Sequence, residues 1–260
     1  MHEGGLGVSS DNGNAMEWYR KAAEQGHERA QLKINDVHQI DKSEPKDDRP
    51  ATQVDPELLK QAENGDAAAQ MLLGMMYLEG NDIPKDETKA NYWMEKSAEH
   101  AHPETQYNLG QMYYEGKDYP KAFEWFQRAA DQGWAEAQMK FGVMYSHGQG
   151  VKQDYQKALE WYYKAAEQGN DFAQYNLGVM YRDGQGVPQD YYKAAEWFRK
   201  AAEQGEAVVV VATAQFNLGV LYRDGQGVIK DKQIGCGLIR KSAEQGIREA
   251  VEEYNRICGK

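Results

Sequence analysis

Two pairs of residues in this sequence are of types that could carry chemistry. Ser43 and Lys46 have the serine-x-x-lysine spacing that places a serine nucleophile near a lysine, but they lie in a polar stretch without companion motifs. His100 and His102 flank one alanine, and no cysteine or carboxylate stands beside them at ligand spacing. We interpret the histidines as surface residues and predict no catalytic residue, no metal and no cofactor.

Glycine loops are the third motif with possible chemical meaning. The tripeptide Gly-Gln-Gly occurs at residues 148–150, 184–186 and 225–227. A phosphate-binding loop is normally a single loop that follows a strand, whereas repetition favours a structural turn. We therefore predict that these glycines turn the chain between helices.

The sequence holds two cysteines, Cys236 and Cys258. They lie ten residues before and twelve after Gly246, where the two arms of a hairpin would turn, so a disulfide between them is geometrically plausible. Such a bridge would contribute about 3 kcal/mol, and two buried thiols are the alternative. A bridge would favour export, periplasmic or secreted, over the cytoplasm, because the cytosol keeps thiols reduced.

A repeated pair of helices must position all of these residues. Residues 173–205 repeat the pattern of residues 137–169 at an offset of 36, and Trp161 and Trp197 keep that spacing. We expect Trp197 to supply buried area in the second helix. A fixed period in this range predicts stacked helical hairpins. A glycine recurs within each first helix, where it costs about 1 kcal/mol, so we expect the second helix to approach there. These glycines are Gly74, Gly110, Gly142, Gly178 and Gly219.

The repeat pattern is A-x-x-L-G-x-x-Y-x-x-G-x-G-V-x-x-D-x-x-K-A-x-x-W-x-x-K-A-A-E-Q-G, and it covers most of residues 67–246. It resembles the Sel-1-like repeat of the tetratricopeptide-like superfamily. The resemblance implies an all-α fold, a right-handed α/α superhelix, that serves as a protein-binding scaffold without catalytic residues. Secreted cysteine-rich members carry a bridge in each repeat, a pattern absent here. Some members are linked to β-lactam binding, which we keep as a remote alternative.

The chain divides into four parts by pattern. Residues 1–40 match partial and degenerate repeats, and because they begin inside a repeat we expect further residues upstream. Residues 41–56 are charged and proline-bearing, which favours a loop or linker. We prefer one degraded repeat here over a boundary between two arrays. Residues 57–246 form the regular array, and residues 247–260 are predicted to be a polar capping helix.

A run of four valines, residues 208–211, lies in an insertion that lengthens one repeat. β-Branched residues favour strands and disfavour the start of a helix. We expect a packed loop between repeats or a longer helix. The alternative is an apolar contact for a partner.

Composition limits the class of partner. The formal net charge is −11 and the pI is about 5.1, which argues against nucleic acid and anionic membrane surfaces. No apolar run approaches the roughly 20 residues of a membrane span. We expect a neutral or basic protein or peptide as the partner, and the sequence gives no oligomeric state.

One face of the first helices is the candidate binding surface. Positions −3, +1 and +4 from each repeat glycine share a helix face, which in tetratricopeptide-like folds lines the concave groove. The +4 series changes along the chain from Leu78 and Tyr114 to two arginines, which suggests an apolar end and a basic end. Packing between neighbouring first helices is the alternative for the −3 series. The predicted contact residues are Tyr107, Tyr114, Tyr175, Arg182, Phe216 and Arg223.

These observations predict a non-enzymatic scaffold or adaptor that binds a partner segment in this groove. Bacterial Sel-1-like proteins, which the sequence resembles, are often scaffolds in signalling or host interaction. An acidic solenoid also suits an inhibitor, such as an immunity protein that neutralises a co-encoded secreted toxin. Both alternatives require protein binding and no chemistry.

Overall fold

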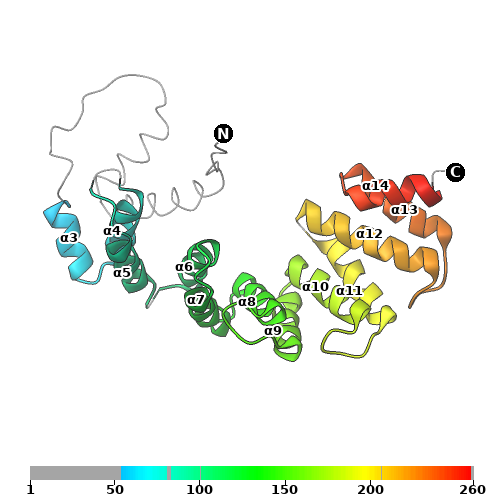
Figure 1. Ribbon diagram of the computed structural model, residues 1–260, viewed down its shortest axis with the longest axis horizontal. Coiled ribbons are helices and arrows are strands. Elements are labelled where there is room, and N and C mark those ends of the chain that lie inside the picture. The colour runs from blue at the N-terminus through cyan, green and yellow to red at the C-terminus, as the bar shows by residue number, and fades with distance from the viewer. Residues whose placement is uncertain (1–53, 81–82, 100, 206, 259–260) are drawn as a thin grey trace, which may run out of the picture. The chain divides into compact units, whose positions relative to one another are not determined.

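The computed structural model describes residues 54–80, 83–99, 101–205 and 207–258, and all regular structure within these ranges is helical (Figure 1). The chain divides into two compact units, residues 1–102 and 103–260, each described here by itself. The predictions for residues 1–40, for Ser43 and Lys46, and for His100 lie outside the described ranges. Among the described residues, no helix has the length and apolar character needed to cross a membrane.

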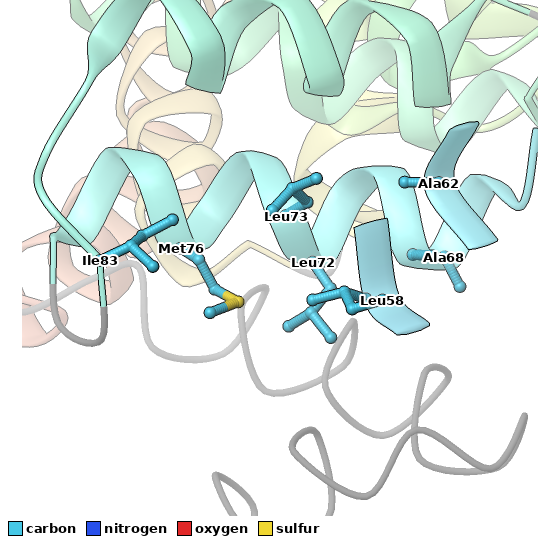
Figure 2. Close-up of a cluster of buried hydrophobic side chains, with 8 residues drawn as sticks. Leu58, Ala62, Ala68, Leu72, Leu73, Met76 and Ile83 are labelled. Atoms are coloured by element: carbon cyan, nitrogen blue, oxygen red, sulfur yellow. The ribbon is translucent and has the colours of Figure 1, made fainter. Parts of the chain in front are cut away.

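The described part of the first unit is a short helix followed by a helical hairpin. Each helix begins at an aspartate whose carboxylate accepts a backbone N–H, which satisfies a donor that the helix leaves open. Figure 2 shows the apolar cluster that joins this helix and the hairpin, in which Leu58 of the short helix lies beside Leu72 of the next one. The helices are α3 (Pro56–Glu63), α4 (Ala67–Glu79) and α5 (Glu87–Ala98).

The second unit is a stack of four helical hairpins and a terminal cap, as the period of 36 residues predicted. Each helix packs on the one before it, within its hairpin and across to the next hairpin. The predicted all-α solenoid of helix–turn–helix repeats is confirmed. The helices are α6 (Pro103–Glu115), α7 (Tyr119–Asp131), α8 (Ala135–His147), α9 (Tyr155–Glu167), α10 (Asp171–Asp183), α11 (Tyr191–Gln204), α12 (Val208–Asp224), α13 (Lys232–Glu244) and α14 (Arg248–Glu253).

The turn inside a hairpin follows from two residue types. Gly184 ends α10 with a φ of 69°, in the left-handed region that glycine adopts without a steric cost. Asp190 begins α11, and its carboxylate accepts the backbone N–H of Lys193 at 3.0 Å. The backbone N–H of Asp190 donates to the carbonyl of Tyr181 at 2.9 Å, which closes the loop. The predicted cap and turn are therefore confirmed.

The recurring glycine lies where the two helices of a hairpin meet. A Cβ atom on Gly178 would lie 2.6 Å from the ring of Phe198, and one on Gly142 would lie 2.7 Å from the ring of Tyr162. The predicted close approach is confirmed, but the expectation about buried area in the second helix is wrong. Trp197 was expected to supply the buried area, yet it is only half-buried, whereas Phe198 is fully buried.

The four valines form the first turn of a helix. α12 begins at Val208 and runs for 17 residues, against 13 in α10. The expectation that valine disfavours a helix start is wrong here, and the alternative of a longer helix is correct. Val210 is buried against Ala201 and Ala214, so tertiary packing outweighs the local preference.

Val208 and Val209 project from this turn and are 64% and 69% exposed. Replacing both with glutamate should leave the free energy of unfolding unchanged or raise it by about 0.5 kcal/mol, because acidic residues favour the first turn of a helix. Val210→Ala should lower it by about 2 kcal/mol through lost burial. Urea denaturation of the two variants tests this contrast. Equal losses in both would show that all the valines pack inside the fold.

The described chain ends in α14 and a π-helical turn, η1 (Tyr254–Cys258), where the sequence predicted a capping helix. Cys236 of α13 and Cys258 of η1 are joined by a disulfide, with their Cα atoms 5.5 Å apart. Arg223 of α12 also pairs with Glu253 of α14. The cap is therefore held by a covalent bond to one helix of the last hairpin and by an ion pair to the other.

Candidate partner-binding face

The six residues predicted to contact a partner lie on three first helices of the second unit. α6 carries Tyr107 and Tyr114, and the remaining four lie on α10 and α12, which contact each other directly. All six side chains are half-buried, so each presents some surface to solvent.

The tyrosines at position −3 from the repeat glycine are backed by buried phenylalanine rings. The ring of Tyr107 lies 5.6 Å from that of Phe126, and the ring of Tyr175 lies 5.7 Å from that of Phe198. Burial raises the pKa of Tyr107 to about 12 and also raises that of Tyr175. Both contacts join the first helix of a hairpin to its own second helix and not to a neighbouring first helix, and they hold each ring in one orientation.

Tyr114 has a defined polar and cationic environment. Its hydroxyl donates to Oε1 of Gln149 at 2.9 Å, and its ring meets that of Tyr119 edge-on at 5.3 Å. The ammonium of Lys140 lies 5.2 Å from the centre of the Tyr114 ring, within cation–π range. Burial lowers the pKa of Lys140. The aromatic face and the cation thus form one small surface.

Arg182 is paired within the chain. Its Nε donates to Oδ1 of Asp183 at 2.7 Å, and its Nη1 donates to Oδ1 of Asn217 on α12 at 2.6 Å. The hydrogen bond from Arg182 lowers the pKa of Asp183, so this carboxylate stays ionised and offsets the positive charge. Arg182 therefore links α10 to α12 and contributes little net charge to the face.

Arg223 holds the terminal cap. Its guanidinium pairs with Asp224 and with Glu253 of α14, and its side chain is only 15% exposed. The hydrogen bond from Arg223 also lowers the pKa of Asp224. Sequence reasoning suggested a basic end of the groove, but both arginines are paired with carboxylates in the structure. Each arginine pairs with the aspartate that follows it in the sequence, and Arg223 pairs in addition with Glu253, 30 residues away, which the sequence gives no means to identify.

The Gly-Gln-Gly loops serve as packing points. The second glycine of each loop lies against the start of the preceding hairpin's second helix. A Cβ atom on Gly186 would lie 2.7 Å from Cβ of Tyr155, and one on Gly227 would lie 2.2 Å from the carbonyl carbon of Tyr191. These loops thus have the structural role that their repetition predicted.

The described residues hold no group of three or more histidine, cysteine, aspartate or glutamate side chains that could bind a metal. Of the two histidines singled out in the sequence, His102 is described, and it is exposed before α6.

Buried glutamines on first helices make hydrogen bonds, within a hairpin and to the hairpin before it, that sequence reasoning missed. Nε2 of Gln138 donates to the carbonyl of Ala130 at 3.2 Å, and its Oε1 accepts from Nε2 of Gln168 at 2.8 Å. Gln132 bonds to Gln106 in the same way at 2.7 Å. The signal was present, because a glutamine stands at the same position of each first helix, after alanine in all of the described ones except α6, and another precedes the glycine that ends most second helices.

The sequence matches the Sel1 repeat family model over most of its length. The matched residues are 1–27, 67–102, 103–134, 135–170, 171–206 and 212–247. A comparison with curated protein sequences finds no match.

Solved structures with similar folds include several Sel1 repeat proteins. The chain is 36% identical to c5321, a protective antigen of uropathogenic Escherichia coli with an SLR fold, at a TM-score of 0.65. The match covers 90% of this chain and 50% of the antigen, so this chain spans half the antigen's length. A Sel1 repeat protein from Oxalobacter formigenes is 34% identical, at a TM-score of 0.61, with 80% of this chain and 82% of that chain covered.

A more distant similarity involves the immunity protein Pa5087 from Pseudomonas aeruginosa. It is 22% identical, at a TM-score of 0.41, with 94% of this chain and 84% of that chain covered. At this distance the similarity concerns architecture alone.

Proposed function

The chain belongs to the Sel1 repeat family, and we propose that, like the family's members in general, it is a non-enzymatic protein-interaction scaffold. We further propose that it binds an extended segment of a partner protein along the first helices of the second unit. Tyr107, Tyr114, Tyr175, Arg182 and Phe216 would provide the contacts, whereas Arg223 would support the cap.

The row of aromatic side chains carries this proposal. Tyr107, Tyr175 and Phe216 occupy the same register of three first helices, and each keeps part of its surface exposed. The two tyrosines rest on buried phenylalanine rings, so little side-chain freedom would be lost on binding. Rigid aromatic residues are typical anchors of protein interfaces.

The charge of the chain favours a neutral or basic partner. The formal net charge is −11, and an oppositely charged surface would approach faster and in a preferred orientation. Arg182 does not change this preference, because Asp183 offsets its charge.

Site-specific photocrosslinking would test the face and capture the partner. A photoreactive amino acid at Gln111, in the +1 position of α6, should yield a covalent partner complex in cells of the source organism. The same amino acid at Gln127, exposed on α7, is the control and should yield none. Equal crosslinking at both positions would contradict the proposed face.

Alanine substitutions would then test the individual contacts. Tyr114→Ala and Arg182→Ala should each weaken the affinity for the captured partner about tenfold or more. Tyr92→Ala and Arg240→Ala, at exposed positions on α5 and α13, should leave the affinity unchanged. Melting temperatures would separate lost folding from lost binding. Unchanged affinity in the first pair would refute the proposed contacts. Loss of a captured enzyme's activity on binding would favour the inhibitor alternative.

A further inference from the structure

A second surface lies between the last two hairpins of the array and shares no residue with the proposed groove. It is an open pocket with a volume of about 720 Å³, lined from α11, α12 and the loop before α13. The lining residues are Tyr192, Arg199, Tyr222, Gly225, Gly227, Val228 and Ile229.

The corresponding place one hairpin earlier is filled by aromatic side chains. There the hydroxyls of Tyr163 and Tyr181 are hydrogen-bonded at 2.5 Å, and Trp197 packs edge-on against Tyr163 at 5.5 Å. At the last interface Arg199 stands at the position of Tyr163, and Leu238 at the position of Trp197. The aromatic pair is therefore replaced by a guanidinium and a smaller aliphatic side chain.

Two further exchanges make the rim apolar. Ile229 stands at the position of Pro188 and is 91% exposed, and Tyr192 stands at the position of Gln156 and is 60% exposed. At the earlier interface, Nε2 of Gln156 donates to the carbonyl of Gly186, a bond that Tyr192 does not reproduce at the last interface. Apolar side chains gathered at a surface depression are typical of interaction sites.

Arg199 supplies a positive charge that lacks an acidic partner. Its Nη2 donates to the Tyr222 hydroxyl at 3.0 Å, and no carboxylate of the described residues lies within 4.0 Å of its guanidinium. The nearby carboxylate of Glu196 acts on the Tyr192 hydroxyl and raises its pKa. Arg182 and Arg223, by contrast, are each paired with a carboxylate. Arg199 can therefore accept a carboxylate from outside the chain.

We propose that this pocket binds an acidic side chain, aspartate or glutamate, flanked by an aromatic or large aliphatic residue in an extended segment of a protein partner. The carboxylate would pair with Arg199, and the apolar neighbour would cover Ile229 and Tyr192. A segment of chain fits better than a compact anion, because the pocket is open and its exposed rim is apolar. Nucleic acid is disfavoured by the net charge of −11.

A capped peptide, acetyl-Gly-Ser-Asp-Phe-Ser-Gly-amide, would serve as the probe, with the same peptide carrying Asn in place of Asp and sodium acetate as references. Nuclear magnetic resonance would follow the side-chain Nε–Hε signal of Arg199 and the methyl signal of Ile229 during titration. With the Asp peptide, the shifts of both signals should reach a plateau. The Asn peptide should bind about tenfold more weakly, because its hydrogen bond is not charge-assisted. Arg199→Gln should reduce the affinity for the Asp peptide by a similar factor.

Ile229→Ser keeps the test independent of folding, since this side chain lies almost wholly in solvent. This substitution should lower the affinity for the Asp peptide several-fold, whereas Arg240→Gln, at an exposed position on α13, should leave that affinity unchanged. The proposal is overturned if the two peptides bind with equal affinity or if neither binding curve reaches saturation. It is also overturned if neither Arg199→Gln nor Ile229→Ser lowers the affinity for the Asp peptide. It is also overturned if acetate alone reproduces the shifts at the same concentration, which would mean a simple anion site.

Discussion

Gly178→Ala should lower the free energy of unfolding by about 1 kcal/mol, although alanine is the better helix former. The new Cβ would lie 2.6 Å from Cδ1 of Phe198, a ring that is fully buried and has no free space into which to move. Overpacking a core costs about 1–3 kcal/mol, which outweighs the gain of about 1 kcal/mol in helix propensity. Urea denaturation of the two proteins would measure the difference.

Gly237→Ala is a matched control in α13. No atom lies within 4 Å of the Cβ position at Gly237, so this substitution should raise stability by about 1 kcal/mol through helix propensity alone. Combining Gly178→Ala with Phe198→Leu should recover part of the loss, because the smaller side chain makes room for the new methyl group. If Gly178→Ala were as stable as Gly237→Ala, the recurring glycine would need another explanation.

Reduction of the disulfide should lower the free energy of unfolding by about 3 kcal/mol. Cys236 and Cys258 are separated by 22 residues, and a bridge over a loop of this length restricts the unfolded chain by about that amount. The loss should appear first as faster hydrogen exchange in residues 248–258, because the bridge fixes η1 to α13. Arg223 should keep α14 partly in place through its pair with Glu253.

Alkylation of the unfolded protein gives the direct check of the bridge. Neither thiol should react before reduction, and both should react afterwards. The double variant Cys236→Ala, Cys258→Ala should match the reduced protein in stability, which excludes an effect of the reductant itself. Equal urea midpoints for the oxidised and reduced proteins would contradict a stabilising role for the bridge.

Features that repeat along the chain could be predicted from the sequence, and features of one position could not. The period identified the hairpins, and Gly184 and Asp190 identified the turn, because local backbone chemistry decides both. The role of Phe198 was missed because tryptophan was assumed to bury the larger area. The helix start at Val208 was missed because Val210 gains its stability from packing on another helix.

The candidate site was less predictable for the same reason. The register of Tyr107 and Tyr175 follows from periodicity, but the pairing of Arg223 with Glu253 depends on where α14 returns to the array. The sequence gives no signal that sets Arg199 apart from the other cations on the second helices. Only its position against Tyr222, and the comparison with Tyr163 one hairpin earlier, distinguish it.

The buried glutamines have a consequence for how this chain can change in length. Gln168 reaches Gln138 in one hairpin, and Gln245 reaches Gln215 in another, each across 30 residues. The pair Gln106 and Gln132 spans 26 residues, shortened by the tighter turn after α6, and still makes the bond. The shorter turn therefore leaves the bond between the two helices of that hairpin intact. A turn can on this basis change in length without loss of the contact that closes the far end of its hairpin.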